Sequence, residues 1–176
     1  MKRPELEHLI RAAGSIANSR ELVIIGSQAI LGTFPDPPSE LTISQEADLY
    51  PLDAPEKAEL VDGSIGEKSP FHDTFGYYAH GVAPETAVLP RNWPSRLARV
   101  QNQNTNGIAG LCLSPVDLAI SKLVAGREKD LSFVKAMLRY KLVQIERIVS
   151  LFPELSPEQV ALVQPRLVRC QLDWPA

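Results

Sequence analysis

A short apolar run that ends at a glycine-serine pair constrains the fold of this chain more than any other feature. Residues 21–25, Glu-Leu-Val-Ile-Ile, are typical of a buried strand, and Gly26 and Ser27 follow directly. The apolar spacing predicts an amphipathic helix over 4–18, before this strand, and one or two helical turns over 28–31, after it. A strand enclosed between helical segments indicates an α/β arrangement.

The rest of the chain extends this arrangement and then changes it. Strands are expected over 41–50 and within 71–82, a helix over 54–61, and a hairpin at Asn106-Gly107 between 97–100 and 108–113. From Ser114 onward the apolar spacing is helical. We therefore expect one structural domain of the α/β (α+β) class, in which residues 1–113 form the core and 114–176 a helical part packed on it.

Composition and charge exclude several classes of protein. The chain is 44% hydrophobic and 22% charged, which is ordinary for a globular protein. Its net charge of −3 argues against binding nucleic acid by bulk charge, so any such contact needs a local patch. No apolar stretch approaches the roughly 20 residues of a membrane span, and no secretory signal opens the chain. Cys112 and Cys170 lack metal-ligand spacing, so we expect reduced thiols in a cytoplasmic protein.

Two features in the first third of the chain suggest phosphate and metal chemistry. Gly26 and Ser27 leave room for a phosphate to meet backbone N–H groups, although a strand-to-helix turn favours these residues for structural reasons too. Glu46 and Asp48 lie at i and i+2 of a predicted strand, so their carboxylates share one face. Two such anions repel unless a cation lies between them, and oxygen ligands suit Mg²⁺. A solvent-exposed acidic edge is the alternative.

A third feature is a basic stretch in the helical part. From Lys122 to Arg147 there are seven basic and three acidic residues, a net charge of +4 that leaves −7 for the remainder of the chain. An asymmetry of this size suits a site that attracts a polyphosphate or an RNA backbone. A solvated helix face with paired charges is the alternative.

Together these features resemble a known superfamily. Gly26-Ser27 with residues 44–49, Ser-Gln-Glu-Ala-Asp-Leu, resembles the Gly-Ser…Asp-x-Asp signature of the DNA polymerase β-like nucleotidyltransferases. Residues 114–118, Ser-Pro-Val-Asp-Leu, with Lys122 and 126–130, Gly-Arg-Glu-Lys-Asp, are similar to the Lys…Arg…Lys-Asp motif of the AbiEii-like toxin branch. That branch includes the toxins of type IV-style toxin–antitoxin systems and the related MenT-type toxins.

The resemblance implies a fold and an activity. The fold is a nucleotidyltransferase-type mixed sheet flanked by helices, with a helical C-terminal part. The activity is transfer of a nucleotidyl group from an NTP, dependent on Mg²⁺ or Mn²⁺, to an RNA (tRNA-like) or protein acceptor, by a toxin with a cognate antitoxin. The implied catalytic residues are Glu46, Asp48, Lys122 and Asp130, the first two also binding the metal, and the implied nucleotide-binding residues are Gly26, Ser27, Ser44, Arg127 and Lys129.

Two departures from the signature leave other hypotheses open. Glu46 stands where the first metal carboxylate is usually aspartate, and a third carboxylate on a later strand is represented by two candidates, Asp73 and Glu85. One alternative is a catalytically inactive nucleotidyltransferase-fold module that binds nucleotide or protein. Another is a small-molecule nucleotidyltransferase. His72 and His80 are placed on the strand within 71–82, in structural or surface roles.

Overall fold

The computed structural model describes residues 1–172, which form two compact units. The sheet unit comprises Met1–Ala87 and Leu97–Ser114, and the helical unit comprises Val88–Arg96 together with the chain from Pro115 onward. The chain therefore passes from one unit to the other three times. Whether residues 114–176 pack on 1–113 as a single structural domain stays a prediction.

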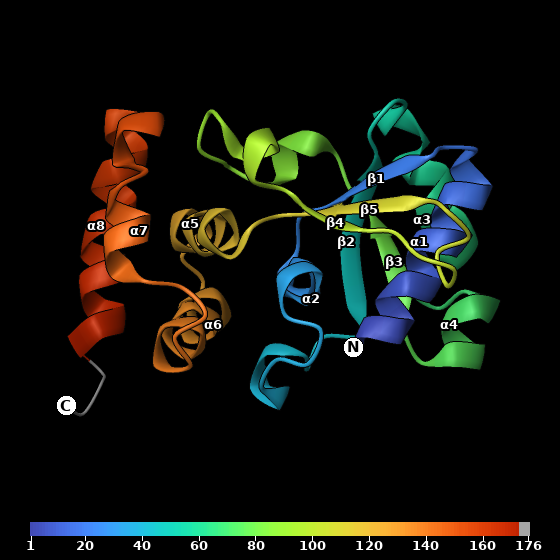
Figure 1. Ribbon diagram of the computed structural model, residues 1–176, viewed down its shortest axis with the longest axis horizontal. Coiled ribbons are helices and arrows are strands. Elements are labelled where there is room, and N and C mark those ends of the chain that lie inside the picture. Colours follow the sequence, from blue (N-terminus) through green and yellow to red (C-terminus); the bar gives the residue numbers. More distant parts are fainter. Residues whose placement is uncertain (173–176) are drawn as a thin grey trace. The chain divides into compact units, whose positions relative to one another are not determined.

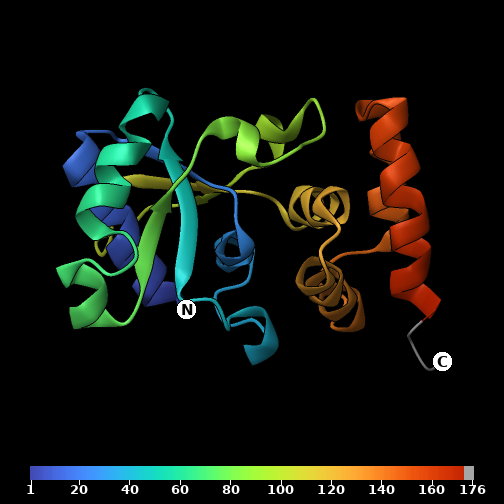
Figure 2. The ribbon, with the colours of Figure 1, turned by 180° about the vertical axis from the view of Figure 1, so that it is seen from behind.

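The sheet unit is built on a five-stranded mixed sheet in the order β3-β2-β1-β5-β4. Its helices and strands are α1 (Arg3–Ala17), β1 (Glu21–Ile24), α2 (Ile30–Thr33), β2 (Glu46–Pro51), α3 (Ala58–Ile65), α4 (Pro70–Phe75), β3 (Tyr78–Gly81), β4 (Ala98–Val100) and β5 (Ala109–Cys112). β1 pairs antiparallel with β2 and parallel with β5, whereas β2 and β3 are parallel and β4 and β5 antiparallel. Figures 1 and 2 both show α1, α3 and α4 on one side of the strands and α2 on the other. The predicted mixed sheet flanked by helices is confirmed.

The core of the sheet unit follows the apolar pattern of the sequence. Leu22, Val23 and Ile24 of β1 are fully buried, as expected for a central strand. The apolar stripe of α1 is buried too, including Leu6 and Ile10. The structure confirms the helix predicted over 4–18, the strand over 21–25 and the hairpin at Asn106-Gly107. Each of these elements was predictable because it depends on a local sequence pattern.

The helical unit contains α5 (Pro115–Ala125), α6 (Glu128–Arg139), α7 (Ile145–Val149) and α8 (Pro157–Leu172). The segment Val88–Arg96 joins them through a buried ion-pair network. Arg96 Nη2 lies 2.7 Å from Asp117 Oδ1 and 3.1 Å from Glu154 Oε2, and the Asp117 side chain is completely buried. None of the described helices has the length and apolar character that crossing a bilayer requires.

Two segments differ from the predicted elements. The strand expected over 41–50 begins only at Glu46. The segment before it opens with the 3-10 turn Ser39–Leu41, and the carbonyls of Thr42 and Ser44 accept hydrogen bonds from the Met1 ammonium group. The segment 71–82 contains the expected strand only in its second half.

The first half of 71–82 lies in the helix α4. Ser69 Oγ caps this helix by accepting a hydrogen bond from the His72 N–H, and Pro70 occupies its first turn. Gly76, with φ 76°, ends the helix in the left-handed region. The placement of His72 on a strand is therefore wrong, whereas His80 does lie on β3.

Candidate active site

The turn after β1 and the acidic strand β2 meet at Gly26 and Asp48. The Ile25 N–H donates to the Asp48 carbonyl at 3.0 Å, which sets the two segments side by side. A Cβ at position 26 would clash with Asp48 Oδ2, so only glycine leaves this carboxylate its place. Ser27 begins the short 3-10 turn Ser27–Ala29 that follows. The structure thus brings the predicted phosphate turn and the second predicted metal ligand into contact.

Glu46 and Asp48 share one face of β2, as their spacing predicts. The intervening Ala47 and the following Leu49 are fully buried on the other face. Ser44 lies just before β2, where its Oγ accepts from the Glu46 N–H at 3.1 Å and so supports the start of the strand. The predicted role of Ser44 in nucleotide binding stays a prediction.

Each of the two carboxylates is hydrogen-bonded to the residue opposite it on β3. In the parallel register Glu46 faces Tyr78, and the Tyr78 hydroxyl donates to Glu46 Oε2 at 3.0 Å. Asp48 faces His80, whose Nδ1 lies 2.8 Å from Asp48 Oδ1. Burial and the hydrogen bond to Glu46 raise the pKa of Tyr78 to about 12, so its phenol stays a donor at neutral pH.

Tyr78 and His80 are the residues that sequence reasoning missed. Tyr78 and His80 are spaced i, i+2 on a strand, as Glu46 and Asp48 are. This equal spacing is the sequence signal that could have indicated that the two pairs face each other. Using that signal requires knowing that β2 and β3 are neighbours in register.

The donor set at β2 suits a hard divalent cation. Among the described residues, Glu46 Oε1 and Asp48 Oδ2 accept no hydrogen bond, so each carboxylate retains one oxygen for a ligand. Mg²⁺ commonly takes one or two protein carboxylates together with waters and substrate phosphates. Residues 1–172 contain no group of three or more His, Cys, Asp and Glu side chains placed to hold a metal alone. A metal held by these two carboxylates would need further ligands, such as waters or substrate phosphates.

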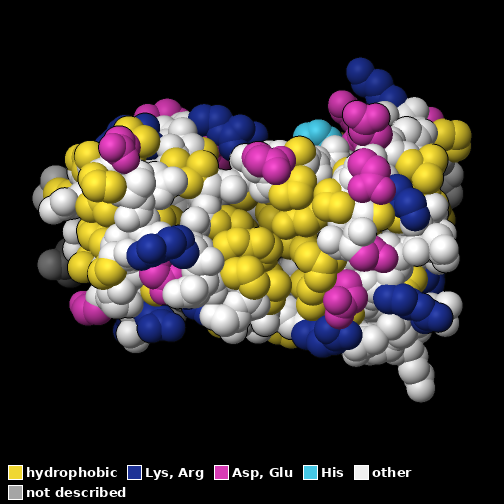
Figure 3. All heavy atoms as spheres, turned by 90° about the horizontal axis from the view of Figure 1, so that it is seen from above, with side chains coloured by type: hydrophobic (Ala, Val, Ile, Leu, Met, Phe, Trp, Pro, Cys, Tyr) yellow, Lys and Arg dark blue, Asp and Glu magenta, His cyan; other side chains and the backbone are white. Residues whose placement is uncertain are grey.

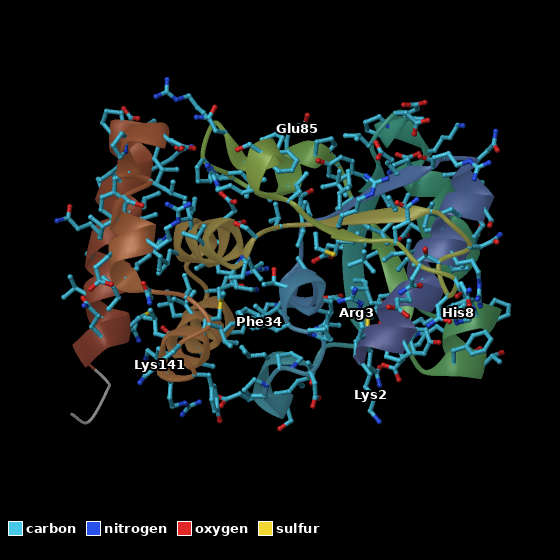
Figure 4. All side chains as sticks on the ribbon, in the orientation of Figure 1. Lys2, Arg3, His8, Phe34, Glu85 and Lys141 are labelled. Atoms are coloured by element: carbon cyan, nitrogen blue, oxygen red, sulfur yellow. The ribbon has the colours of Figure 1, made fainter. Side chains whose placement is uncertain are left out.

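Neither candidate for a third carboxylate lies on a strand. Asp73 is exposed on α4, and Glu85 is exposed on the 3-10 turn Pro84–Thr86, where Figure 4 labels it. Tyr50 is buried on β2, two residues beyond Asp48 and on the same face. Burial and, after it, the negative charge of Glu85 raise the pKa of Tyr50.

Gln28 is an unusual residue next to the phosphate turn. Its side chain is fully buried, yet neither its amide oxygen nor its amide nitrogen has a hydrogen-bond partner among the described residues. A buried amide without partners is unfavourable for folding. Either the Gln28 amide binds a ligand, or an apolar residue at this position would make the protein more stable.

In the helical unit, three of the predicted residues form a compact ion-pair cluster. Asp130 is only 1% exposed, and its two oxygens lie 3.2 Å from Lys122 Nζ and 2.6 Å from Arg127 Nε. Burial alone would raise the pKa of Asp130, but the Arg127 hydrogen bond and the Lys122 charge outweigh it and hold that pKa below 3.8. Gly126, with φ 68°, forms the bend between α5 and α6 that brings Lys122 and Arg127 to one carboxylate.

The predicted site residues thus fall into two groups, one in each unit. Gly26, Ser27, Ser44, Glu46 and Asp48 belong to the sheet unit, and Lys122, Arg127, Lys129 and Asp130 to the helical unit. Lys129 is exposed at the start of α6.

The charge asymmetry follows the same division. The sheet unit contains 7 basic and 14 acidic residues, for a net charge of −7, and the helical unit contains 11 basic and 7 acidic residues, for +4. In the view of Figure 3, acidic and basic side chains are interspersed instead of forming a field of one sign.

Comparison with known proteins finds a matching family model. A family model described as a nucleotidyltransferase of unknown function (DUF6036) matches residues 5–160, a range that includes both groups of residues. Neither the curated proteins nor the solved structures contain a match.

Proposed function

Because the chain belongs to the DUF6036 family of nucleotidyltransferases, we propose that it transfers a nucleotidyl group from a nucleoside triphosphate to an RNA acceptor. The observation that carries this proposal is the contact of Asp48 with Gly26, which sets a carboxylate against a glycine-serine turn. That pairing suits a triphosphate whose oxygens meet the N–H groups of the turn. A divalent cation bound by the carboxylate would neutralise the charge of the triphosphate.

The residues of the sheet unit would bind and orient the nucleotide. The turn at Gly26 and Ser27 would accommodate the triphosphate. Glu46 and Asp48 would hold the metal through the oxygens to which no donor of residues 1–172 is bonded. A bound Mg²⁺ or Mn²⁺ would supply neutralisation of the triphosphate charge. Tyr78 and His80 would hold the two carboxylates in place during this process, so that little rearrangement is needed on binding.

The residues of the helical unit would supply positive charge for phosphate groups. The buried Asp130 would orient Lys122 and Arg127 through the ion pairs that it forms with both. Arg127 is 65% exposed and Lys129 is exposed, so both can contact an anion. The net charge of +4 on this unit favours an RNA backbone over a neutral small molecule as acceptor.

We further propose that the biological setting is a toxin–antitoxin pair. Support comes from the similarity of residues 114–130 to the AbiEii-like toxin motif. Induced expression of the wild-type chain should then arrest bacterial growth, and Asp48→Ala should abolish the arrest. Growth arrest by both forms alike would contradict this setting.

A catalytically inactive module is the competing function, and one observation favours it. β3 presents Tyr78 and His80 to the acidic strand, and it contains no carboxylate. Such a protein would bind nucleotide or a partner protein through the same fold without releasing pyrophosphate.

The two functions are separated by incubating the protein with each α-³²P-labelled NTP, Mg²⁺ or Mn²⁺ and total bacterial RNA. We expect wild type to label RNA and Asp48→Ala to fail. Asp36→Ala, which removes an exposed acid in the loop after α2, is the matched control and should label normally. Labelled protein instead of RNA would identify a protein acceptor. Nucleotide binding without any transfer, unchanged by Asp48→Ala, would establish the inactive module.

A further inference from the structure

The geometry points to His80 as a positioning residue that fixes the Asp48 carboxylate for metal–nucleotide binding, an inference that rests on the proposed function. His80 lies opposite Asp48 in the parallel pairing of β2 and β3. Its Nδ1 lies 2.8 Å from Asp48 Oδ1, the distance of a charge-assisted hydrogen bond.

The chemistry of the pair defines which nitrogen donates. An ionised carboxylate can only accept hydrogen bonds, so Nδ1 of His80 must hold the hydrogen. This contact therefore orients both groups: the imidazole presents its N–H to Oδ1, and Oδ1 is held toward β3. Donors in a second layer orient metal-binding groups in this way in many metal sites.

The second oxygen of the same carboxylate is constrained by a different segment. Asp48 Oδ2 occupies the space that a side chain at position 26 would fill. A carboxylate rotates over a broad range about its terminal torsion, and the hydrogen bond from His80 removes that freedom. With Oδ1 tied to His80, Oδ2 is directed at the turn formed by Gly26 and Ser27, where the triphosphate is proposed to lie.

The exposure of the pair fits a role in ligand binding better than a role in stability. The Asp48 side chain is 25% exposed and that of His80 is 50% exposed. Pairs this accessible to water contribute little to folding. Removing the imidazole should therefore leave the fold intact and change only what the carboxylate can bind.

Three substitutions at position 80 test this inference. His80→Ala removes the donor. His80→Asn keeps a nitrogen bonded to Cγ, as Nδ1 is in histidine, whereas His80→Gln places its nitrogen one bond further out. The probe is Mn²⁺ in the presence of a nucleoside triphosphate, with free Mn²⁺ measured by its electron paramagnetic resonance signal.

We expect His80→Ala and His80→Gln to weaken Mn²⁺ binding by about 10- to 100-fold, the usual effect of losing an orienting partner. His80→Asn should restore binding close to that of wild type. The midpoint of thermal unfolding should be unchanged in all three. His8→Ala, which removes a histidine that contacts Tyr77 and Phe75, is the control and should leave Mn²⁺ affinity unchanged.

The possible failures are distinguishable. If wild type takes up no Mn²⁺ with any nucleotide, the proposed function fails, and this inference fails with it. If wild type binds and His80→Ala binds equally well, only the inference is overturned. Equal losses in His80→Ala and His80→Asn would also overturn it. In the transfer reaction, His80→Ala should raise KM for the metal–nucleotide complex more than it lowers kcat, and a fall in kcat alone contradicts a positioning role.

Discussion

Lys122 and Asp130 form a pair in which the anion is almost completely buried and the cation nearly so. The two side chains are 1% and 11% exposed, and Lys122 Nζ lies 3.2 Å from Asp130 Oδ1. The Lys122 ammonium also lies 4.5 Å from the centre of the Phe133 ring, which limits its contact with water further. Asp130 therefore holds two positive charges of the helical unit, those of Lys122 and Arg127, next to each other.

Replacing Asp130 with asparagine should destabilise the protein. The substitution removes the Asp130 charge from beside the largely buried Lys122 ammonium and weakens the Arg127 contact. We expect a loss of about 1–3 kcal/mol in the free energy of unfolding, measured by urea denaturation. Lys129→Gln changes an exposed charge one residue away and should shift the value by less than about 0.5 kcal/mol. Equal stabilities of Asp130→Asn and wild type would show that the cluster does not support the fold.

The contribution of Asp130 should disappear in acid. Its pKa in the folded protein lies below the ordinary 3.8, so the stabilisation is complete above pH 3.8 and is lost as the pH falls through the lower, folded value. The stability difference between wild type and Asp130→Asn should thus be constant from about pH 7 to 5 and shrink below about pH 4. Thermal unfolding of both proteins across this range measures the difference, and a gap that widens in acid would contradict the assignment.

Gly26→Ala should disable the site through one added methyl group. The methyl clashes with Asp48 Oδ2, and its accommodation should cost about 1–3 kcal/mol and displace the carboxylate from the turn. We expect nucleotide binding, followed by calorimetry, to be lost. Gly63→Ala is the matched control, because a Cβ there meets nothing within 4 Å and the residue lies inside α3. That variant should bind normally and gain about 0.5–1 kcal/mol of stability.

Gln28→Met should stabilise the protein. It replaces two buried polar groups, which have no hydrogen-bond partner within residues 1–172, with an apolar chain of similar length. An unpaired buried amide costs roughly 1–3 kcal/mol. Thermal unfolding should show a higher midpoint than wild type. Gln164→Met, at an exposed position on α8, should change stability by less than about 0.5 kcal/mol. A lower midpoint for Gln28→Met would mean that the amide has a binding partner in solution.

The sequence predicted those parts of the site that depend on local patterns. The strand before Gly26 and the common face of Glu46 and Asp48 follow from burial and a period of two, and both are confirmed. The partners Tyr78 and His80 depend on the register between β2 and β3, which are joined by two helices, and no local pattern sets that register. The segment around His72 was predicted as strand because aromatic residues favour strands, whereas Ser69, Pro70 and Gly76 give it the ends of a helix.

The segment Val88–Arg96 gives the helical unit a second, separate stretch of sequence. Arg96 is 14% exposed and binds both Asp117 and Glu154, which follow in the chain only after the sheet unit has been completed by β4 and β5. A gene fragment ending at Ser114 would therefore encode Arg96 without Asp117 and Glu154, the two carboxylates that it binds. A fragment starting at Pro115 would encode those carboxylates without the arginine. No single cut yields either unit whole, so one crossover cannot exchange one unit and leave the other intact.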